Sequence, residues 1–295
     1  MSLNSFRDKD PRRGLFCHDF SFIIIALIKC EFMPFTITSL QNDRVKQVRA
    51  LQTVARVRRT ENRIVLEGMR LIGDALDSAA RPEYVLYTAE AMTHRAGADL
   101  LNRIQLLQIE SIEVSAEVMA HMADTQTPQG WLAVFATPEL TMPDAPTLLL
   151  ILSGVADPGN LGTILRTAAA AAFDLVILTP GCVDAFNPKS LRSGMGAHFR
   201  IPVRRLNWTE IRQSYGHLPL RLADAAGELS YSTVDWRSAA GLIIGGEARG
   251  ADEEALGLAT ERISIPMGNA AESLNAAMAA AVIMFEARRQ RSLIG

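Results

Sequence analysis

The sequence predicts an α/β protein of two domains, a smaller α/β domain followed by a larger one built on a parallel sheet. The length of 295 residues favours two domains over one or three. A proline-rich stretch over 137–147 separates two segments with different patterns and is the expected linker. In the second segment, nearly continuous apolar runs of strand length alternate with helical patterns. Strands that are covered on both faces of a sheet have such continuous apolar runs, so a doubly wound parallel sheet is expected.

Composition describes a globular protein with a substantial core. The chain is 48% hydrophobic and 21% charged, and its net charge of −2 gives no general affinity for nucleic acid. Cys17, Cys30 and Cys182 are odd in number, far apart and without C-x-x-C spacing. This pattern supports neither a disulfide framework nor a metal site. It favours a reducing compartment, and we expect a cytoplasmic protein.

Residues 1–33 differ from the rest of the chain. Arg12 and Arg13 precede an apolar run over 20–28, which is shorter than the ~20 residues that a membrane helix needs. The run would suit the apolar region of a signal peptide, but no small-residue cleavage pattern follows it. The alternative is that Met33 is the natural start. We expect 1–33 to be an extension or leader outside the fold, and no membrane partner.

Residues 34–136 predict a compact α/β domain that binds RNA. The expected elements are a helical stretch over 37–75, a strand over 83–88, a helix over 96–107 and a strand over 130–135. Between 34 and 70, eight basic residues face three acidic ones, a local charge of +5. A solvated helix face would look the same, and an RNA phosphate-binding surface is the functional alternative. The candidate RNA-binding residues here are Arg44, Lys46, Arg56, Arg58 and Arg59.

Residues 148–295 predict the parallel-sheet domain. Its expected strands cover 148–155, 174–179, 199–203, 218–222, 242–246 and 263–267. Its expected helices cover 161–172, 188–195, 209–215 and 273–290. Ligands of such domains bind beyond the carboxyl ends of the strands. The polar and glycine-rich segments at three of these strand ends are therefore the candidate site.

The first strand end is D-P-G-N-L-G-T-I-L-R over 157–166. Asn160 suits the N-cap of the following helix, which is also its simplest explanation. Arg166 lies six residues later, about 240° around a helix and ~9 Å along it. Asn160 and Arg166 therefore do not share one helix face. Either they serve different sites, or a second chain brings one of them into the first site.

The second strand end is G-L-I-I-G-G-E-A-R-G over 241–250. Gly245 and Gly246 let the backbone approach a ligand with no Cβ in the way. The segment is neither G-x-G-x-x-G nor a P-loop, so it gives little support to dinucleotide binding. Glu247 is either a solvated turn residue or a carboxylate directed at a substrate.

The third strand end joins I-S-I-P-M-G over 263–268 to E-S-L-N-A-A-M over 272–278. Proline ends the hydrogen bonding of the strand, and a glycine follows. Ser273 is expected to cap the last helix, whose apolar positions follow helical spacing. Ser273 and Asn275 are polar at the mouth of the domain, which a purely structural role explains poorly.

The order N-x-G-x-x-x-R-T-A, G-G-E-x-x-G and I-P-M-x(5)-S-L-N-x-A resembles the three motifs of the SpoU (TrmH-like) branch of the SPOUT RNA methyltransferases. Residues 34–136 also resemble the family's substrate-binding module, notably I-T-S-L-Q-N at 37–42 and L-E-G-M-R at 66–70. The resemblance covers nearly everything after Met33, which supports Met33 as the start.

The resemblance implies a fold, a cofactor and a reaction. The C-terminal domain would form a trefoil knot that binds S-adenosylmethionine, and the enzyme would methylate a ribose 2′-hydroxyl of structured RNA. The matching catalytic positions are Asn160, Arg166, Glu247, Ser273 and Asn275. The matching cofactor positions, which act mainly through the backbone, are Gly245, Gly246, Ile265, Met267 and Leu274.

Members of the family are homodimers whose arginine crosses the interface, which agrees with the helix geometry above. The small-residue face of the last helix is a candidate dimer contact. Arginine is normally protonated, so we favour a phosphate clamp over a general base for Arg166. Lys189 and Arg192 match the region between motifs and are further RNA candidates, or else belong to a solvated helix start.

The N-terminal module resembles that of rRNA-modifying members more than the compact tRNA members. Methylation of 23S-type rRNA is therefore expected, with tRNA as the alternative substrate. Two other classes remain open from the residues: a catalytically silent RNA-binding protein of the same fold, and a nucleotide-dependent oxidoreductase.

Overall fold

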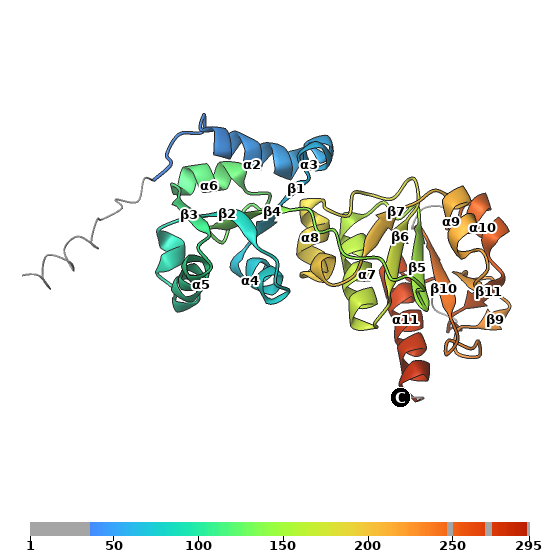
Figure 1. The fold of residues 1–295 in the computed structure, drawn as a ribbon. Coiled ribbons are helices and arrows are strands. Elements are labelled where there is room, and N and C mark those ends of the chain that lie inside the picture. The colour runs from blue at the N-terminus through green and yellow to red at the C-terminus, as the bar shows by residue number, and fades with distance from the viewer. Residues whose placement is uncertain (1–35, 247–249, 269–272, 294–295) are drawn as a thin grey trace, which may run out of the picture. The chain divides into compact units, whose positions relative to one another are not determined.

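The computed structural model describes residues 36–246, 250–268 and 273–293 (Figure 1). The expected leader at 1–33 and the candidate catalytic residue Glu247 lie outside the described residues. Within the described ranges, no helix has both the length and the apolar character needed to cross a bilayer.

The N-terminal domain contains a four-stranded sheet in the order β1-β4-β2-β3. Its strands are β1 (Arg63–Glu67), β2 (Pro82–Tyr87), β3 (Glu110–Glu113) and β4 (Trp131–Ala136). Its helices are α2 (Asp43–Thr53), α3 (Ala55–Glu61), α4 (Met69–Asp77), η1 (Glu90–Met92), α5 (Arg95–Leu106) and α6 (Ala116–Met122). Strand β4 is antiparallel to β1 and β2, and β2 is parallel to β3. Helices α2 and α6 cover one face of the sheet, and α4 and α5 cover the other.

The expected helical stretch over 37–75 is wrong in its middle, where β1 forms. Asn62 adopts a left-handed conformation with φ of 52° and ends α3. The sequence R-I-V-L-E then pairs along its whole length with β4, and four of its five residues are buried. β-Branched residues suit such a pleated, buried surface. The other expected elements of this domain lie within one residue of the observed β2, α5 and β4.

The C-terminal domain is built on a seven-stranded sheet in the order β7-β6-β5-β10-β8-β11-β9. Its strands are β5 (Leu148–Ser153), β6 (Leu175–Leu178), β7 (Val203–Arg205), β8 (Leu220–Ala223), β9 (Leu229–Ser230), β10 (Ala240–Gly245) and β11 (Glu261–Ser264). Every strand pair in it is parallel, which confirms the predicted sheet type.

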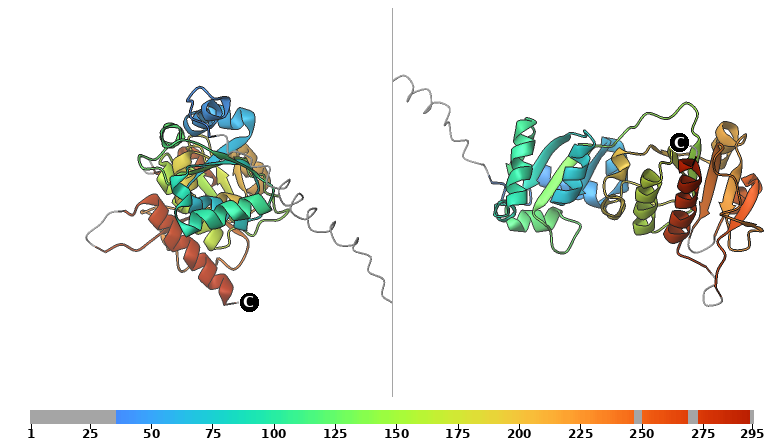
Figure 2. Two further views of the ribbon diagram at one scale, coloured as in Figure 1. Left: turned by 90° about the vertical axis from the view of Figure 1, so that its left-hand side faces the viewer. Right: turned by 90° about the horizontal axis from the view of Figure 1, so that it is seen from below.

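Helices cover both faces of the parallel sheet. They are α7 (Pro158–Ala170), α8 (Pro188–Gly194), η2 (Ala197–Phe199), α9 (Trp208–Tyr215), α10 (Glu253–Leu258) and α11 (Ala276–Ser292). Helices α7 and α11 pack on one face, and α9 and α10 on the other (Figure 2). The expected strand over 199–203 is displaced, because β7 begins only at Val203. Ile201 donates its N–H to Ala197 in a helical turn, and Pro202 has no N–H to donate.

The register of the sheet brings the three motif segments to one edge. Gly245 of β10 pairs with Ser153 of β5, and Ile244 pairs with Ala223 of β8. Ala223 in turn pairs with Ile263 of β11. Because all these strands run in the same direction, the loops that follow them leave the sheet at the same side.

Candidate active site

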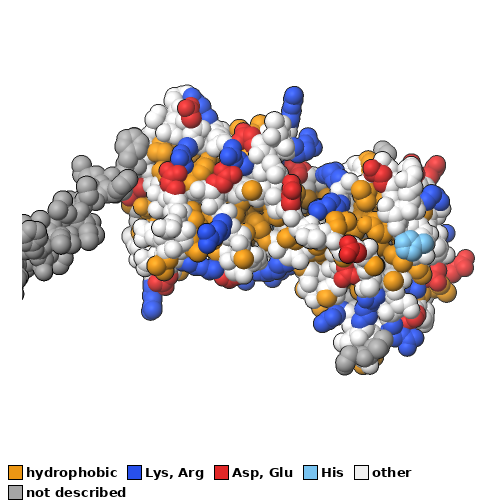
Figure 3. All heavy atoms as spheres, in the orientation of Figure 1, with side chains coloured by type: hydrophobic (Ala, Val, Ile, Leu, Met, Phe, Trp, Pro, Cys, Tyr) orange, Lys and Arg blue, Asp and Glu red, His pale blue; other side chains and the backbone are white. Residues whose placement is uncertain are grey.

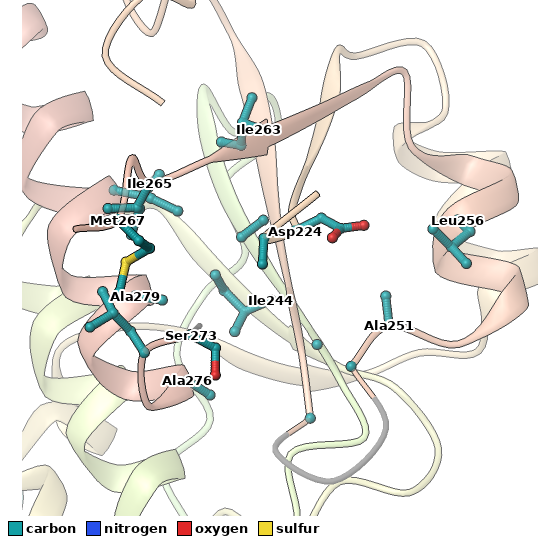
Figure 4. Close-up of a pocket in the computed structure, with 17 residues that line it drawn as sticks. Asp224, Ile244, Ala251, Leu256, Ile263, Ile265, Met267, Ser273, Ala276 and Ala279 are labelled. Atoms are coloured by element: carbon teal, nitrogen blue, oxygen red, sulfur yellow. The ribbon is translucent and has the colours of Figure 1, made fainter. Parts of the chain in front are cut away.

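A cavity of about 460 Å³ lies beyond the carboxyl ends of β8, β10 and β11 (Figure 4). It is bounded by the two glycines after β10, by the segment after β11 and by the start of α11. All five residues that the sequence predicted for cofactor binding line it: Gly245, Gly246, Ile265, Met267 and Leu274. The structure therefore gathers the predicted cofactor positions in one place.

The two glycines of this wall are required by close backbone packing. A Cβ on Gly246 would lie 2.4 Å from the carbonyl oxygen of Gly154, and a Cβ on Gly245 would lie 2.5 Å from the carbonyl carbon of Gly250. Gly246 and Gly250 also exchange two backbone hydrogen bonds, of 3.1 and 3.0 Å. The cavity wall is therefore backbone, with no room for a side chain on its outer side.

We expect Gly246→Ala to disrupt this wall. The added methyl group would push against the Gly154 carbonyl, and overpacking of this kind costs about 1–3 kcal/mol. The variant should unfold at lower urea concentration and bind S-adenosylmethionine more weakly in calorimetry. Gly257→Ala is the matched control, because a Cβ at Gly257 meets nothing within 4 Å. Equal behaviour of the two variants would contradict the packing argument.

The lining of the cavity suits a nucleoside. Apolar side chains form most of it, including Ile244, Ile263, Ile265 and Met267. The backbone at the strand ends supplies N–H and C=O groups. These groups can hydrogen-bond to the edge of a base and to a ribose whatever side chains the residues carry. Asp224 is the one charged side chain among the lining residues that the structure describes. Sequence reasoning missed Asp224, although a carboxylate directly after a parallel strand was a visible signal.

Two predicted catalytic residues meet at the rim of the cavity. The Nδ2 of Asn275 donates a hydrogen bond of 3.2 Å to the Oδ1 of Asn160, across 115 positions in the chain. The Oδ1 of Asn275 accepts from the N–H groups of Ala277 and Met278, so Asn275 caps α11. The expectation that Ser273 caps this helix is wrong. The backbone turns helical only after Asn275, and Ser273 lines the cavity instead.

The expected cap at Asn160 is also wrong. Asp157 has an extended backbone and accepts the Asn160 N–H at 2.8 Å, while Pro158 occupies the first helical position. Asn160 is thereby the third residue of α7, within its first turn, and its amide oxygen accepts the hydrogen bond from Asn275. The hydrogen bond from Asn160 N–H and the ion pair with Lys189, at 3.0 Å, lower the pKa of Asp157.

Lys189 is the second residue of α8 and lies beside Asp157 and Gly159 at the start of α7. Its Nζ would be 3.5 Å from a Cβ placed on Gly159, and its side chain is about half exposed. Arg166, by contrast, lies exposed farther along α7 and makes no hydrogen bond or ion pair to another described residue. Ser273 lines the cavity, and Asn275, which is bonded to Asn160, stands between the lining residues Leu274 and Ala276, whereas Arg166 takes no part in these contacts.

Arg58 does not belong to the predicted RNA-binding surface. Its side chain is 5% exposed, and Nε and Nη2 donate to Asp184 Oδ2 at 2.9 and 2.6 Å. Its Nη1 donates to the carbonyls of Leu51 and Gln52. All its donors are thus directed inward, which contradicts the expectation that this guanidinium contacts phosphate.

The other basic candidates differ in their exposure and in whether they form ion pairs. Arg192 is bound to Asp124 at 2.7 Å and is only partly exposed, so its role in RNA binding is not favoured. Arg44 pairs with Glu110 at 2.9 Å and lies over the ring of Tyr84. Lys46 is 3.9 Å from Asp43 on the same helix. Charges of both signs mix on the face drawn in Figure 3. Arg56 and Arg59 are exposed and make no ion pair with a described residue.

Known proteins share both parts of this chain. Residues 147–285 match the profile of the SpoU rRNA Methylase family, and residues 42–133 match that of the MRM3-like substrate binding domain. The 23S rRNA (guanosine(2553)-2′-O)-methyltransferase RlmP of Bacillus subtilis is 35% identical over 85% of this chain and 98% of its own. The mitochondrial rRNA methyltransferase 3 of Mus musculus is 34% identical over 79% of this chain and 69% of its own.

Solved structures agree with these relatives. The SpoU methyltransferase AviRb from Streptomyces viridochromogenes, in complex with AdoMet, superposes with a TM-score of 0.76 at 27% identity, over 85% of this chain and 99% of that one. The AdoMet-bound rRNA methyltransferase from Sinorhizobium meliloti gives a TM-score of 0.73 at 30% identity, over 86% and 97%. With its motifs gathered at one strand edge, this chain belongs to the SpoU rRNA methylase family.

Proposed function

We propose that the protein transfers a methyl group from S-adenosylmethionine to a ribose 2′-hydroxyl of ribosomal RNA. The observation that supports this most directly is the contact between Asn160 and Asn275 at the rim of a cavity lined by all five expected cofactor positions. Substrate-binding and methylase profiles together cover most of the described chain. The names of the relatives support rRNA over tRNA.

The reaction needs three contributions from the chain. S-adenosylmethionine supplies the methyl group on a sulfonium, and the backbone around Gly245, Ile265 and Leu274 would hold its nucleoside. The ribose must be fixed in line with that methyl group, a task for the amides of Asn160 and Asn275. The hydroxyl passes its proton to solvent water, and the alkoxide that develops needs a cation nearby. We assign this role to Arg166, together with the grip on the adjacent phosphate, because a guanidinium carries a fixed positive charge and several N–H donors.

Transfer of tritiated methyl groups to bulk RNA tests this function. We expect incorporation into rRNA, and mapping of 2′-O-methyl positions on the product should find one nucleotide. Incorporation into tRNA alone would support the alternative substrate. Incorporation into neither, with RNA binding intact, would support the catalytically silent reading. Binding of a nicotinamide cofactor without S-adenosylmethionine binding would revive the oxidoreductase.

Arg56 and Arg59 of α3 are the strongest remaining candidates for phosphate contacts, because both are exposed and unpaired among the described residues. Alanine at both positions should weaken binding of an rRNA fragment and reduce the dependence of log K on log salt by about 0.7–0.9 per lost contact. Filter binding from low to high salt measures this. Arg95→Ala is the control, since that exposed arginine is already paired with Asp99. An unchanged salt slope would place the RNA elsewhere.

We propose further that the enzyme is a homodimer that uses α11. Its exposed face presents Met278, Val282 and Phe285, which are 58%, 39% and 51% exposed. The expectation that the small-residue face forms this contact needs correction, because Ala277 and Ala280 are buried in the core of their own domain. Three large apolar side chains at helical spacing support a partner on the opposite side of the helix.

Phe285→Glu should convert the enzyme to a monomer, because a carboxylate would be buried in the apolar contact. Light scattering after gel filtration measures the mass, and methyl transfer should fall with it if Arg166 acts in the partner's site. Leu106→Glu is the matched control, since Leu106 of α5 is 85% exposed and lies outside α11. A monomeric wild-type enzyme with full activity would contradict this arrangement.

The trefoil knot and the cytoplasmic location are also proposals. Family membership supports the knot. So does the position of the segments after β10 and β11, which line one cavity together with the start of α11. The buried free thiol of Cys182 suits a reducing compartment. The relative from Mus musculus is named mitochondrial, so fractionation of the native host decides the location.

A further inference from the structure

Asp224 directly follows β8, in the middle of the strand edge on which the cofactor cavity opens. Its N–H donates to the Ile263 carbonyl of β11 at 2.9 Å, and the preceding Ala223 pairs with Ile244 of β10. Asp224 therefore lies between the end of β10 at Gly245 and the segment that contains Ile265. Both neighbouring segments line the same cavity (Figure 4).

The Asp224 carboxylate is held in a fixed position. Its Oδ1 accepts the Ala226 N–H at 2.9 Å. Its Oδ2 accepts from Arg262, at 3.0 Å from Nε and 2.6 Å from Nη2. Burial by itself would raise the pKa of Asp224, but these hydrogen bonds from Ala226 and Arg262 lower it. The carboxylate is ionised at neutral pH, and its side chain is 26% exposed at the cavity wall.

One acceptor position of this carboxylate is still open. An ionised carboxylate accepts about four hydrogen bonds, and the chain supplies three of them here. No other charged side chain lines the described part of the cavity. A cofactor donor that reaches this wall would therefore meet a single, well-oriented acceptor.

We propose that this open position of Asp224 accepts a hydrogen bond from a ribose hydroxyl of the cofactor nucleoside, so that Asp224 contributes to cofactor affinity. The inference rests on the S-adenosylmethionine site proposed above. A positively charged ammonium group is a poorer partner, because Arg262 already neutralises the carboxylate and would repel it. The planar base suits the apolar group formed by Ile265, Met267 and Ala279, away from the carboxylate (Figure 4).

Calorimetry on the full chain with 5′-methylthioadenosine tests this assignment, since that probe has both ribose hydroxyls but no ammonium group. Asp224→Ala should weaken its binding on the order of tenfold or more, as expected for a lost hydrogen bond to a charged group. One of the two deoxy forms of the probe, 2′-deoxy or 3′-deoxy, lacks the hydroxyl that Asp224 accepts. That form should bind the wild type more weakly than the parent probe does. It should also bind the wild type and the Asp224→Ala variant equally well. That pattern identifies the hydroxyl that Asp224 accepts.

Asp235→Ala is the matched control. Asp235 also pairs with an arginine, Arg237, at 2.6 Å, but it does not line the cavity, so its removal should leave probe binding unchanged. Asp224→Asn keeps the shape and one acceptor, so it should show a smaller loss with the same analogue pattern, even if the alanine variant folds poorly. The inference would be overturned if Asp224→Ala weakened the binding of the parent probe and of both deoxy probes equally, or weakened none of them. Failure of the wild type to bind S-adenosylhomocysteine would instead overturn the cofactor site itself.

Discussion

Arg166→Ala should slow methyl transfer strongly while leaving the affinity for S-adenosylmethionine nearly unchanged. Arg166 is exposed on α7, outside the cavity lining, so its removal disturbs neither the glycine wall nor the apolar walls. Loss of one preorganised charge at a developing oxyanion typically costs about 10²–10³-fold in turnover. Single-turnover transfer of tritiated methyl to rRNA measures the rate, and calorimetry measures cofactor binding.

Arg212→Ala is a suitable control, because Arg212 is an exposed arginine on α9 of the same domain. Asn160→Ala should behave like Arg166→Ala, with lost turnover and retained cofactor affinity. Arg166→Lys should recover little, since an ammonium cannot grip a phosphate in two places. If Arg166→Ala lost cofactor binding instead, the role assigned to this arginine would be wrong.

Arg58→Ala should destabilise the protein by about 3–5 kcal/mol, because it leaves Asp184 and two backbone carbonyls without their donor in a site with little access to water. Urea unfolding followed by circular dichroism measures the loss. The double variant Arg58→Ala/Asp184→Ala should be less damaging than the sum of the single ones, because the second change removes the stranded charge.

Arg59→Ala provides the matched comparison, since Arg59 is the exposed neighbour of Arg58 on α3. Its effect on unfolding should stay within about 0.5 kcal/mol. Alanine at position 58 should therefore lower the stability of the protein, and alanine at position 59 should weaken RNA binding. A stable Arg58→Ala variant with weakened RNA binding would reverse the assignment.

The contrast between these two neighbours shows where sequence reasoning stops. Both belong to one basic segment, and nothing local distinguishes them. The partner that buries Arg58 is Asp184, 126 positions away, and only the folded chain brings the two together. The parallel sheet, in contrast, was predictable, because strands covered on both faces need continuous apolar runs.

The sequence predicted roughly where helices α7 and α11 begin, but not which residue caps each of them. Asp157 and Asn160 both suit a cap, as do Ser273 and Asn275. The choice depends on where the backbone turns helical, which neighbouring elements decide. The predicted cofactor positions nevertheless all reached the cavity, since strand ends of a parallel sheet converge whatever their exact boundaries.

The backbone wall at Gly245 and Gly246 has a consequence for chemical intervention. A compound that packs against the wall formed by Gly245 and Gly246 would meet main-chain atoms there, which mutation cannot remove, and glycines that admit no larger residue. Resistance by substitution should therefore be rare there. Selectivity between related enzymes should be equally hard to obtain from that wall, and an inhibitor designer would have to seek it at the cavity's few distinctive side chains.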